Sequence, residues 1–301
     1  YLVKWGAKKI RILDNLSTGS IENIKKHINN SSVEFIKGDI CNLDLCYDIV
    51  KNIDFISHQA ALGSVPRSIK NPDKVNLINV CGHLNMLVAA KESKKLKKMI
   101  YASSSSLYGS SIESPKIEGE EGDLLSPYAV TKLTNELYAD IFSKVYGFNT
   151  VGLRYFNVFG PKQNLNSVYS AVIPIFIKSI ISNVNPTING DGKISRDFTF
   201  VENVIQANIK ALFNTTNLDK HIVCNIGMGG SITLNKLWQS LNEISGKNIC
   251  ANYGPERKGD IEHSLASIKK ANRFFNYKPK ISFNNGLKYT FNYIYENLNL
   301  E

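Results

Sequence analysis

Short apolar runs alternate with amphipathic segments along the first half of the chain. Apolar runs with the length of buried strands occupy residues 8–14, 33–37, 54–59, 98–102 and 149–156, and helical spacing of apolar residues marks 20–28 and 43–50. Strands and helices that alternate at such short intervals predict a parallel, doubly wound α/β sheet. A helix at 201–213 and a strand at 222–226 are predicted to return to this sheet, and residues 1–7 are predicted to be the last turns of a helix.

The clearest helix signal begins at Pro127. Ser126 is a good N-cap and proline suits the first helical position. On this helix Tyr128 and Lys132 lie one turn apart and share a face. Apolar residues continue on a different face, which is predicted to be buried, at Val130, Leu133, Leu137, Ile141 and Val145.

The strand at 98–102 leads into a hydroxyl-rich turn, Ser103 to Ser106, where Gly or Asn would be usual. A Tyr-x-x-x-Lys pattern on its own is more often a surface pair. Here a strand end that offers hydroxyls precedes a helix that offers Tyr128 and Lys132. The combination predicts a proton-transfer site.

A second candidate site follows the strand at 8–14, which ends in Asp14 and then a turn containing Gly19. This is the pattern of the second strand of a dinucleotide-binding unit, in which the carboxylate binds ribose hydroxyls. An Asx turn is the alternative for a lone aspartate. The first strand and Gly-rich turn of such a unit are absent from the chain, and we expect the natural protein to begin earlier.

Composition excludes several classes. The 301 residues, 43% hydrophobic, fit one large or two unequal domains. No apolar run approaches the about 20 residues of a membrane helix, and no signal peptide opens the chain, so we expect a cytoplasmic protein without a membrane partner. The five cysteines form no Cys-x-x-Cys pair, and no metal site is predicted. The formal net charge is +10, but the densest lysine cluster, 91–98, contains no aromatic residue, so a solvated face is favoured over nucleic-acid binding.

Together these motifs resemble the extended short-chain dehydrogenases/reductases, and most closely the bacterial UDP-N-acetylglucosamine 4-epimerases of surface polysaccharide biosynthesis. The resemblance covers nearly all of the chain and also rests on residues 13–19, 58–68, 153–160, 189–192 and 195–198. It implies a Rossmann-type NAD-binding domain at 1–160 and about 197–226, and a smaller nucleotide-sugar domain at about 161–196 and 227–301. It further implies NAD as cofactor, a UDP-sugar substrate, and a homodimer formed through a helix bundle.

The same resemblance implies the roles of the reacting groups. Tyr128 removes the proton from the sugar 4-hydroxyl, Ser104 hydrogen-bonds the reacting oxygen, and Lys132 supplies a positive charge. A free tyrosine titrates near ~10, so a base active at neutral pH needs a pKa lowered by roughly 3 units. One ammonium supplies ~1 to 3 units, so the positive nicotinamide ring is expected to share this task.

The remaining contacts also follow from the resemblance. Asn79 is expected to tie the sheet to the active-site strand. Ser264 stands where galactose-type epimerases carry a bulky tyrosine, which implies room for an N-acetyl group. Contacts with NAD are implied for Asp14, Asn15, Ser17, Thr18, Gly19, Asp39, Ile40, Gln59, Ala60, Ala61, Asn79, Tyr128, Lys132 and Tyr155. Contacts with the UDP-sugar are implied for Ser64, Val65, Arg67, Ser105, Ser106, Asn157, Ala171, Val172, Asn189, Arg196, Arg257, Asp260 and Ser264.

Related activities stay open at this stage. UDP-glucose epimerases and enzymes acting on uronic acid forms share Tyr128 and Lys132. The 4,6-dehydratases carry Asp-Glu, and the UDP-glucuronate decarboxylases Ser-Glu, where this chain has Ser105 and Ser106, so both are disfavoured. A non-catalytic NAD-sensing protein on the same fold commonly loses the Tyr/Lys pair, which this chain retains.

Overall fold

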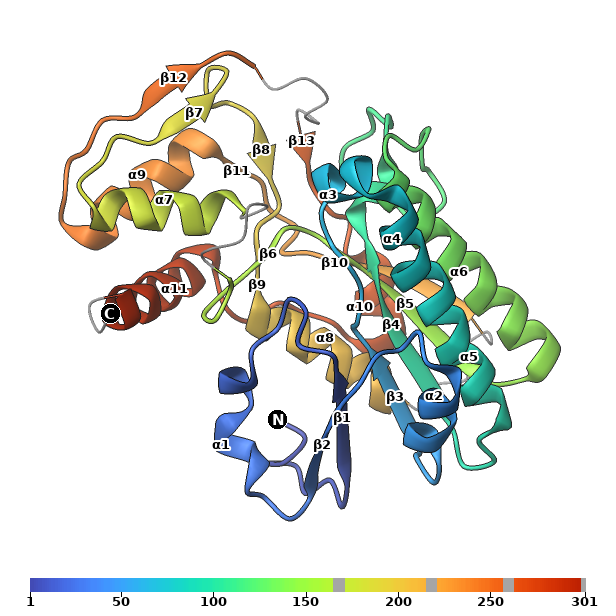
Figure 1. Ribbon diagram of the computed structural model, residues 1–301. Coiled ribbons are helices and arrows are strands. Elements are labelled where there is room, and N and C mark those ends of the chain that lie inside the picture. The colour runs from blue at the N-terminus through green and yellow to red at the C-terminus, as the bar shows by residue number, and fades with distance from the viewer. Residues whose placement is uncertain (165–170, 215–220, 257–262, 299–301) are drawn as a thin grey trace.

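A parallel sheet forms the centre of the molecule (Figure 1). The computed structural model describes residues 1–164, 171–214, 221–256 and 263–298. Four parallel strands follow the order β10-β5-β4-β3: β10 (His221–Ile226), β5 (Asn149–Tyr155), β4 (Lys98–Ser104) and β3 (Phe55–His58). A separate parallel pair is formed by β1 (Ile10–Asp14) and β2 (Val33–Lys37). Among the described residues, no ladder joins β1 to β3.

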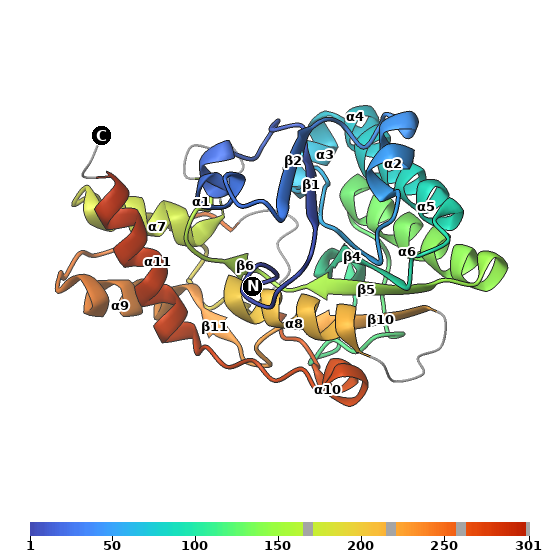
Figure 2. The ribbon, with the colours of Figure 1, turned by 90° about the horizontal axis from the view of Figure 1, so that it is seen from below.

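Helices cover both faces of this sheet, as Figure 2 shows from below. One layer contains α2 (Leu43–Val50), α5 (Gly82–Glu92) and α6 (Pro127–Tyr146), and the other contains α8 (Val201–Phe213) and α10 (Lys269–Phe275). Leu87 and Met99 are fully buried in the first layer, and Ala207 and Leu153 in the second. The predicted doubly wound α/β arrangement is confirmed.

Shorter helices connect these elements. Residues 20–28, predicted as one helix, form a 3-10 turn (Ile21–Asn23) and a four-residue α1 (Lys25–Ile28), neither of which has a buried residue. After β3 come α3 (Val65–Lys70), α4 (Pro72–Asn76) and a π-helical segment (Leu77–Cys81). Residues 1–7 form a turn in place of the predicted helix end, with a hydrogen bond from the Trp5 N–H to the Tyr1 carbonyl (2.9 Å).

A second lobe lies beside the sheet. Its core packs Phe176 of α7 (Val172–Ile181), Trp238 of α9 (Leu234–Ser245) and Leu287 of α11 (Phe283–Leu298). Its short strands are β7 (Thr187–Asn189) paired with β12 (Asn252–Gly254), and β8 (Ser195–Arg196) between β11 (Ile232–Thr233) and β13 (His263–Ser264). The pair β6 (Val158–Phe159) and β9 (Thr199–Phe200) completes the elements. The residue boundaries between two domains stay a prediction.

The apolar series on α6 is not buried. Val130, Leu137, Ile141 and Val145 are between 49% and 64% exposed. The buried face of α6 instead consists mainly of small and polar residues, together with Phe142: Ala129, Thr131, Lys132, Asn135, Glu136, Ala139, Phe142 and Ser143. The predicted burial of the apolar series is therefore wrong, although Tyr128 and Lys132 do lie on a different face.

No helix among the described residues is long and apolar enough to cross a membrane.

Candidate active site

The N-terminus of α6 presents Tyr128 and Lys132. The Ser126 hydroxyl accepts a hydrogen bond from the Ala129 N–H (3.2 Å), as an N-cap does, and the Ser68 hydroxyl accepts one from the Tyr128 N–H (3.0 Å). Tyr128 is half-buried and Lys132 is 3% exposed. The Lys132 Nζ donates to the Ala102 carbonyl at 2.8 Å and lies 5.9 Å from the centre of the Tyr128 ring. The two groups are thus held together by helix geometry and by the end of β4.

The electrostatics of this pair differ from the expectation. Burial raises the pKa of Tyr128, and a hydrogen bond with Ser104 lowers it in part. Burial lowers the pKa of Lys132 to about 8, against the opposing effect of the Glu136 charge. The net direction of the pKa of Tyr128 is therefore upward, and the Lys132 ammonium donates its hydrogen bond to the Ala102 carbonyl. The predicted lowering, which Lys132 is expected to share with the positive nicotinamide ring, is not found for the protein alone.

The serines continue β4 further than predicted. Ser103 and Ser104 belong to the strand, and only Ser105 and Ser106 lie in the 3-10 turn that follows (Ser105–Tyr108). The Ser104 Oγ accepts a hydrogen bond from the Ser106 N–H at 3.1 Å. The Ser106 Oγ is buried and has no hydrogen-bond partner among the described residues. Buried hydroxyls are normally paired, so Ser106 retains capacity for a ligand.

The residues predicted to bind the adenosine half of NAD lie together at the ends of β1 and β2. The Asp14 Oδ1 accepts a hydrogen bond from the Leu16 N–H (2.7 Å), and Oδ2 has no partner among the described residues. A Cβ at Gly19 would lie 3.2 Å from that Oδ2, so the turn carrying Ser17 and Thr18 passes close to the carboxylate. The Asn15 Nδ2 donates to the Asp39 Oδ2 (2.8 Å). Ile40, next to Asp39, is buried.

The predicted nicotinamide side centres on the loop after β3. The Tyr155 hydroxyl donates to the Gln59 Oε1 at 2.9 Å, which brings the ends of β5 and β3 together. Ala60 is exposed and Ala61 is half-buried in this loop.

Asn79 differs from its expected role. Its Oδ1 accepts from the Leu62 N–H (2.7 Å) and its Nδ2 donates to the Thr131 Oγ1 (3.1 Å). It therefore joins the loop after β3 to α6, and the expected link to the active-site strand is wrong.

The predicted sugar side draws on both lobes. Ser64 caps α3, where its hydroxyl accepts from the Arg67 N–H (3.3 Å), and Val65 opens that helix. Asn157 follows β5 with φ +28°. In the second lobe Ala171 caps α7, Val172 begins it and Asn189 ends β7. Arg257 and Asp260 lie outside the described residues.

Ser264 lies in β13, in register with Arg196 of β8. It is buried, and Ala266, two residues later, packs against Tyr108 of the serine turn and against Phe156. The Lys116 N–H also donates to the Leu265 carbonyl (2.7 Å). These contacts bring the strand that carries Ser264 next to the segment that carries Ser105 and Ser106.

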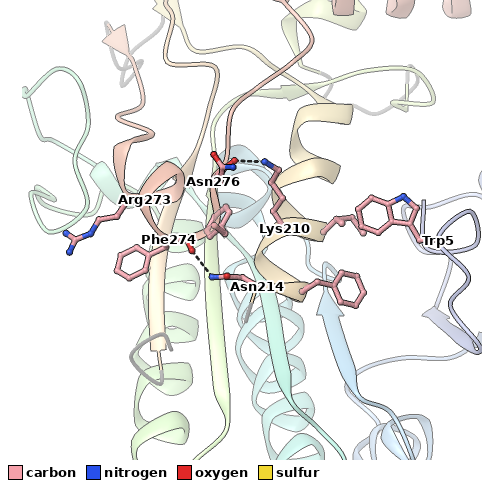
Figure 3. A pocket seen from close by; sticks show the side chains of 9 residues that line it. Trp5, Lys210, Asn214, Arg273, Phe274 and Asn276 are labelled. Carbon is pink, nitrogen blue, oxygen red and sulfur yellow. Dashed lines mark hydrogen bonds between the residues drawn. The ribbon is translucent and has the colours of Figure 1, made fainter. Parts of the chain in front are cut away.

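The molecule also has a hollow away from these residues. Figure 3 shows a pocket of about 430 Å³ between the C-terminal ends of α8 and α10 and Trp5. The Asn214 Nδ2 donates to the Phe274 carbonyl (2.7 Å) there, and Lys210 donates to the carbonyl of Asn276. None of the predicted site residues that the structure describes lines this pocket. The predicted site is therefore elsewhere, between the strand ends and the second lobe.

Sequence reasoning missed three charged residues behind the site. Arg154 of β5 forms ion pairs with Glu136 of α6 and with Glu121. Two signals could have found them: Glu136 follows Lys132 by one more turn of the helix, and an arginine within a buried strand needs a partner.

Comparison with known proteins identifies the family. The model of the NAD dependent epimerase/dehydratase family matches residues 1–227. The chain belongs to this family. NAD is accordingly its cofactor, and the predicted resemblance to the extended short-chain dehydrogenases/reductases is confirmed.

Individual relatives in this epimerase/dehydratase family differ in their substrates. A putative UDP-glucose 4-epimerase of Methanocaldococcus jannaschii is 35% identical over 95% of this chain and 90% of its own length. A UDP-N-acetylglucosamine 4-epimerase of Methanobrevibacter ruminantium M1, in complex with UDP-N-acetylmuramic acid, is 38% identical over 96% of this chain and 91% of that chain, with a TM-score of 0.91. A UDP-glucuronic acid 4-epimerase of Bacillus cereus, in complex with UDP-glucuronic acid and NAD, is 30% identical over 99% and 94%, with a TM-score of 0.90.

The residues present fit NAD. The Oδ2 of Asp14, which has no partner in the described part of the chain, is a suitable acceptor for ribose hydroxyls. Because a carboxylate at this position repels the 2'-phosphate of NADP, the donor set favours NAD over NADP.

Proposed function

We propose that this protein interconverts the C4 epimers of a UDP-N-acetylhexosamine through a 4-keto sugar, in the supply of sugars for surface polysaccharides. The observation that carries the proposal is the grouping of Tyr128, Lys132 and Ser104 at the end of β4. The relatives named above, all 4-epimerases of UDP-sugars, support the reaction class.

In the proposed mechanism Tyr128 takes the proton from the sugar 4-hydroxyl and later returns it. Bound NAD supplies the hydride acceptor, and then the donor, at C4. Ser104 hydrogen-bonds the reacting oxygen, and Ser105 and Ser106 hold the sugar, the latter with its unpartnered hydroxyl. The Lys132 ammonium stabilises negative charge as it develops on the phenol.

The rest of the proposed site holds the substrate and NAD by the contacts predicted above. Arg196 binds the diphosphate, as a guanidinium is suited to do. Asn157 donates to the same group. Ser264 leaves space for the N-acetyl group when the ring turns over, which favours an N-acetylhexosamine over glucose alone.

Product analysis tests this proposal. The protein is incubated separately with UDP-N-acetylglucosamine, UDP-glucose and UDP-glucuronate in the presence of NAD, and the UDP-sugars are separated by chromatography. We expect the galacto epimer of the N-acetyl sugar to form fastest. Release of a 4-keto-6-deoxy sugar or of carbon dioxide would contradict it, and so would the absence of any product.

We further propose a homodimer formed through α6. The face bearing Val130, Leu137, Ile141 and Val145 is exposed in the single chain, although each residue is apolar. Such a continuous apolar face on a 20-residue helix is suited to pair with the same face of a second copy, because a two-fold interface uses one patch twice.

A further inference from the structure

A buried carboxylate lies one helical turn beyond Lys132. Glu136 is 6% exposed on α6, and Arg154 of β5 is 5% exposed. The Arg154 Nε and Nη2 donate to the two oxygens of Glu136 at 2.9 and 2.7 Å, which is the bidentate geometry of a strong ion pair. The Ser103 hydroxyl of β4 donates to the same carboxylate. Groups on two strands therefore fix the position of Glu136.

Arg154 also forms an ion pair with a second carboxylate. Its Nη1 donates to Glu121, which belongs to the segment between β4 and α6. The guanidinium also lies 5.2 Å from the centre of the Tyr108 ring. One arginine between two carboxylates leaves this cluster with one net negative charge. Glu136, the carboxylate on α6, follows the buried Lys132 by one helical turn, and its charge raises the pKa of that ammonium.

Among the described residues, the other titratable groups around Lys132 carry no negative charge that could replace Glu136. His58 faces it from β3, His83 from α5, and Tyr128 from its own helix. Burial lowers the pKa of His58 to about 3, with the Lys132 charge adding to the effect, and lowers that of His83 as well, so both imidazoles are neutral at pH 7. Of the charged groups that act on Lys132 within the described residues, Glu136 is the anion. A buried ammonium without an anion is strongly disfavoured.

We propose that Glu136 is a positioning residue that keeps Lys132 protonated for catalysis, and that Arg154 and Ser103 hold the carboxylate in the place this requires. The proposal deepens the proposed function, on which its kinetic test rests. The charge state of Lys132 itself is measurable without turnover.

The direct test is an NMR titration of protein labelled with ¹³C at the lysine ε-carbon, compared with a Glu136→Gln variant. Lys132 is assigned as the resonance that a Lys132→Met variant lacks. Removing a neighbouring opposite charge lowers a lysine pKa by about 1 to 3 units, so we expect the midpoint of the Lys132 titration to fall by that amount.

The matched control is Glu121→Gln. It removes the same charge from the same arginine, but at the end of the cluster where the side chain is 28% exposed and beside a hollow of about 440 Å³. Its effect on the Lys132 midpoint should be several-fold smaller. An unchanged midpoint in Glu136→Gln, or equal shifts in both variants, overturns the proposal.

A second variant covers the case in which Glu136→Gln does not fold. Glu136→Asp keeps the charge and moves it by one methylene, so its Lys132 midpoint should stay closer to that of the parent protein than a neutral residue would allow. If Glu136→Asp lowers the Lys132 midpoint by as much as Glu136→Gln does, the charge of Glu136 is not what keeps Lys132 protonated. If Glu136→Gln does not fold, a fall of more than about 3 units in the Lys132 midpoint of Glu136→Asp leads to the same conclusion.

The kinetic test is the pH profile of kcat/KM for the UDP-sugar. With the midpoint of Lys132 lowered from about 8 by about 1 to 3 units, the alkaline limb should move to lower pH. The loss should be about fivefold to five-hundredfold at pH 8 and much smaller near pH 6, at most about tenfold. A uniform loss at all pH values contradicts the proposal, because a merely structural role would have that effect. A shifted NMR midpoint in a protein that turns over no UDP-sugar would support the inference and contradict the proposed function.

Discussion

Burial disfavours the charged forms that catalysis needs, the phenolate of Tyr128 and the ammonium of Lys132. Burial raises the pKa of the phenol and lowers that of the ammonium to about 8. A phenolate beside an ammonium therefore depends on groups that favour the charged pair, which here are the hydroxyl of Ser104 and the carboxylate of Glu136. The positive nicotinamide of NAD favours the phenolate as well.

Replacing the phenol oxygen tests the proposed base. Tyr128→Phe should lower kcat by about a hundredfold to ten-thousandfold, the range contributed by one general base, with little change in the melting temperature because the ring remains. Tyr138→Phe on the same helix is the control, since its ring is also partly exposed and it has no proposed role. A Tyr128→Phe variant that retains a tenth of the parent rate would rule out this role.

Substrate breadth should depend on Ser264. Its side chain is buried in β13 beside Arg196, so a tyrosine there would occupy space assigned to the N-acetyl group. Overpacking costs ~1 to 3 kcal/mol, which corresponds to roughly a tenfold to hundredfold change. We expect Ser264→Tyr to lower kcat/KM for UDP-N-acetylglucosamine by that factor relative to UDP-glucose. Steady-state kinetics with both sugars, and Ser264→Ala as control, measure the ratio; a constant ratio would place Ser264 away from the sugar.

At the scale of elements, α6 shows what hydrophobic spacing can predict. The spacing correctly indicated a helix beginning at Pro127 and an apolar face. It could not indicate that the apolar face is exposed in the single chain. The face of α6 that packs against the sheet carries buried polar residues of the proposed site, among them Lys132 and Glu136. A polar face that makes specific buried contacts has no periodic signature of its own.

Other elements follow the same logic. Helices α2 and α8 match their predicted bounds, because each combines a clear pattern with residues buried in the sheet layers. Strand β2 also matches its predicted bounds, although its residues are at most half-buried. The segment 20–28 does not form one helix, because Ser20 caps a 3-10 turn and Ile24 stands at φ −111° between two short pieces. Without a buried face, propensity alone does not sustain a longer helix.

The exposed face of α6 predicts the oligomeric state. Ile141→Glu should place a charge at the centre of the proposed interface and convert a dimer into a monomer, with the fold retained because Ile141 is 53% exposed in the single chain. Light scattering after size-exclusion chromatography measures the mass. Ile112→Glu is the control, since that side chain is 92% exposed and lies outside α6. A monomeric parent protein, or an Ile141→Glu variant that remains dimeric, would refute the proposed interface.

At the scale of the whole molecule, the contacts that join distant segments were not predictable from the chain. Arg154 brings together residues 33 positions and 18 positions away, and Asp197 binds backbone from two other segments. Residue types at these positions indicate only that a charge needs a partner. Which partner it meets depends on the packing of both lobes.

Asp197 should make the free energy of unfolding depend on pH. The fully buried carboxylate accepts hydrogen bonds from the Met228 (2.7 Å), Gly229 (2.9 Å) and Ala266 (3.2 Å) N–H groups, so it joins the segment between β8 and β9 to the segments that follow β10 and β13. Burial raises its pKa from the ordinary 3.8 to about 6, outweighing those hydrogen bonds.

The folded state therefore binds this proton more tightly than the unfolded state, so the stabilisation is complete below about pH 4 and is lost as pH rises through about 6. Asp197→Asn cannot titrate, so the free energy of unfolding of the parent protein should fall relative to the variant by about 2 kcal/mol between pH 4 and pH 7, whatever constant difference the amide introduces. Urea unfolding of both proteins across this range gives the difference directly, and a difference that stays constant, or that moves in favour of the parent as pH rises, would show that Asp197 is already ionised at pH 4 in the folded protein.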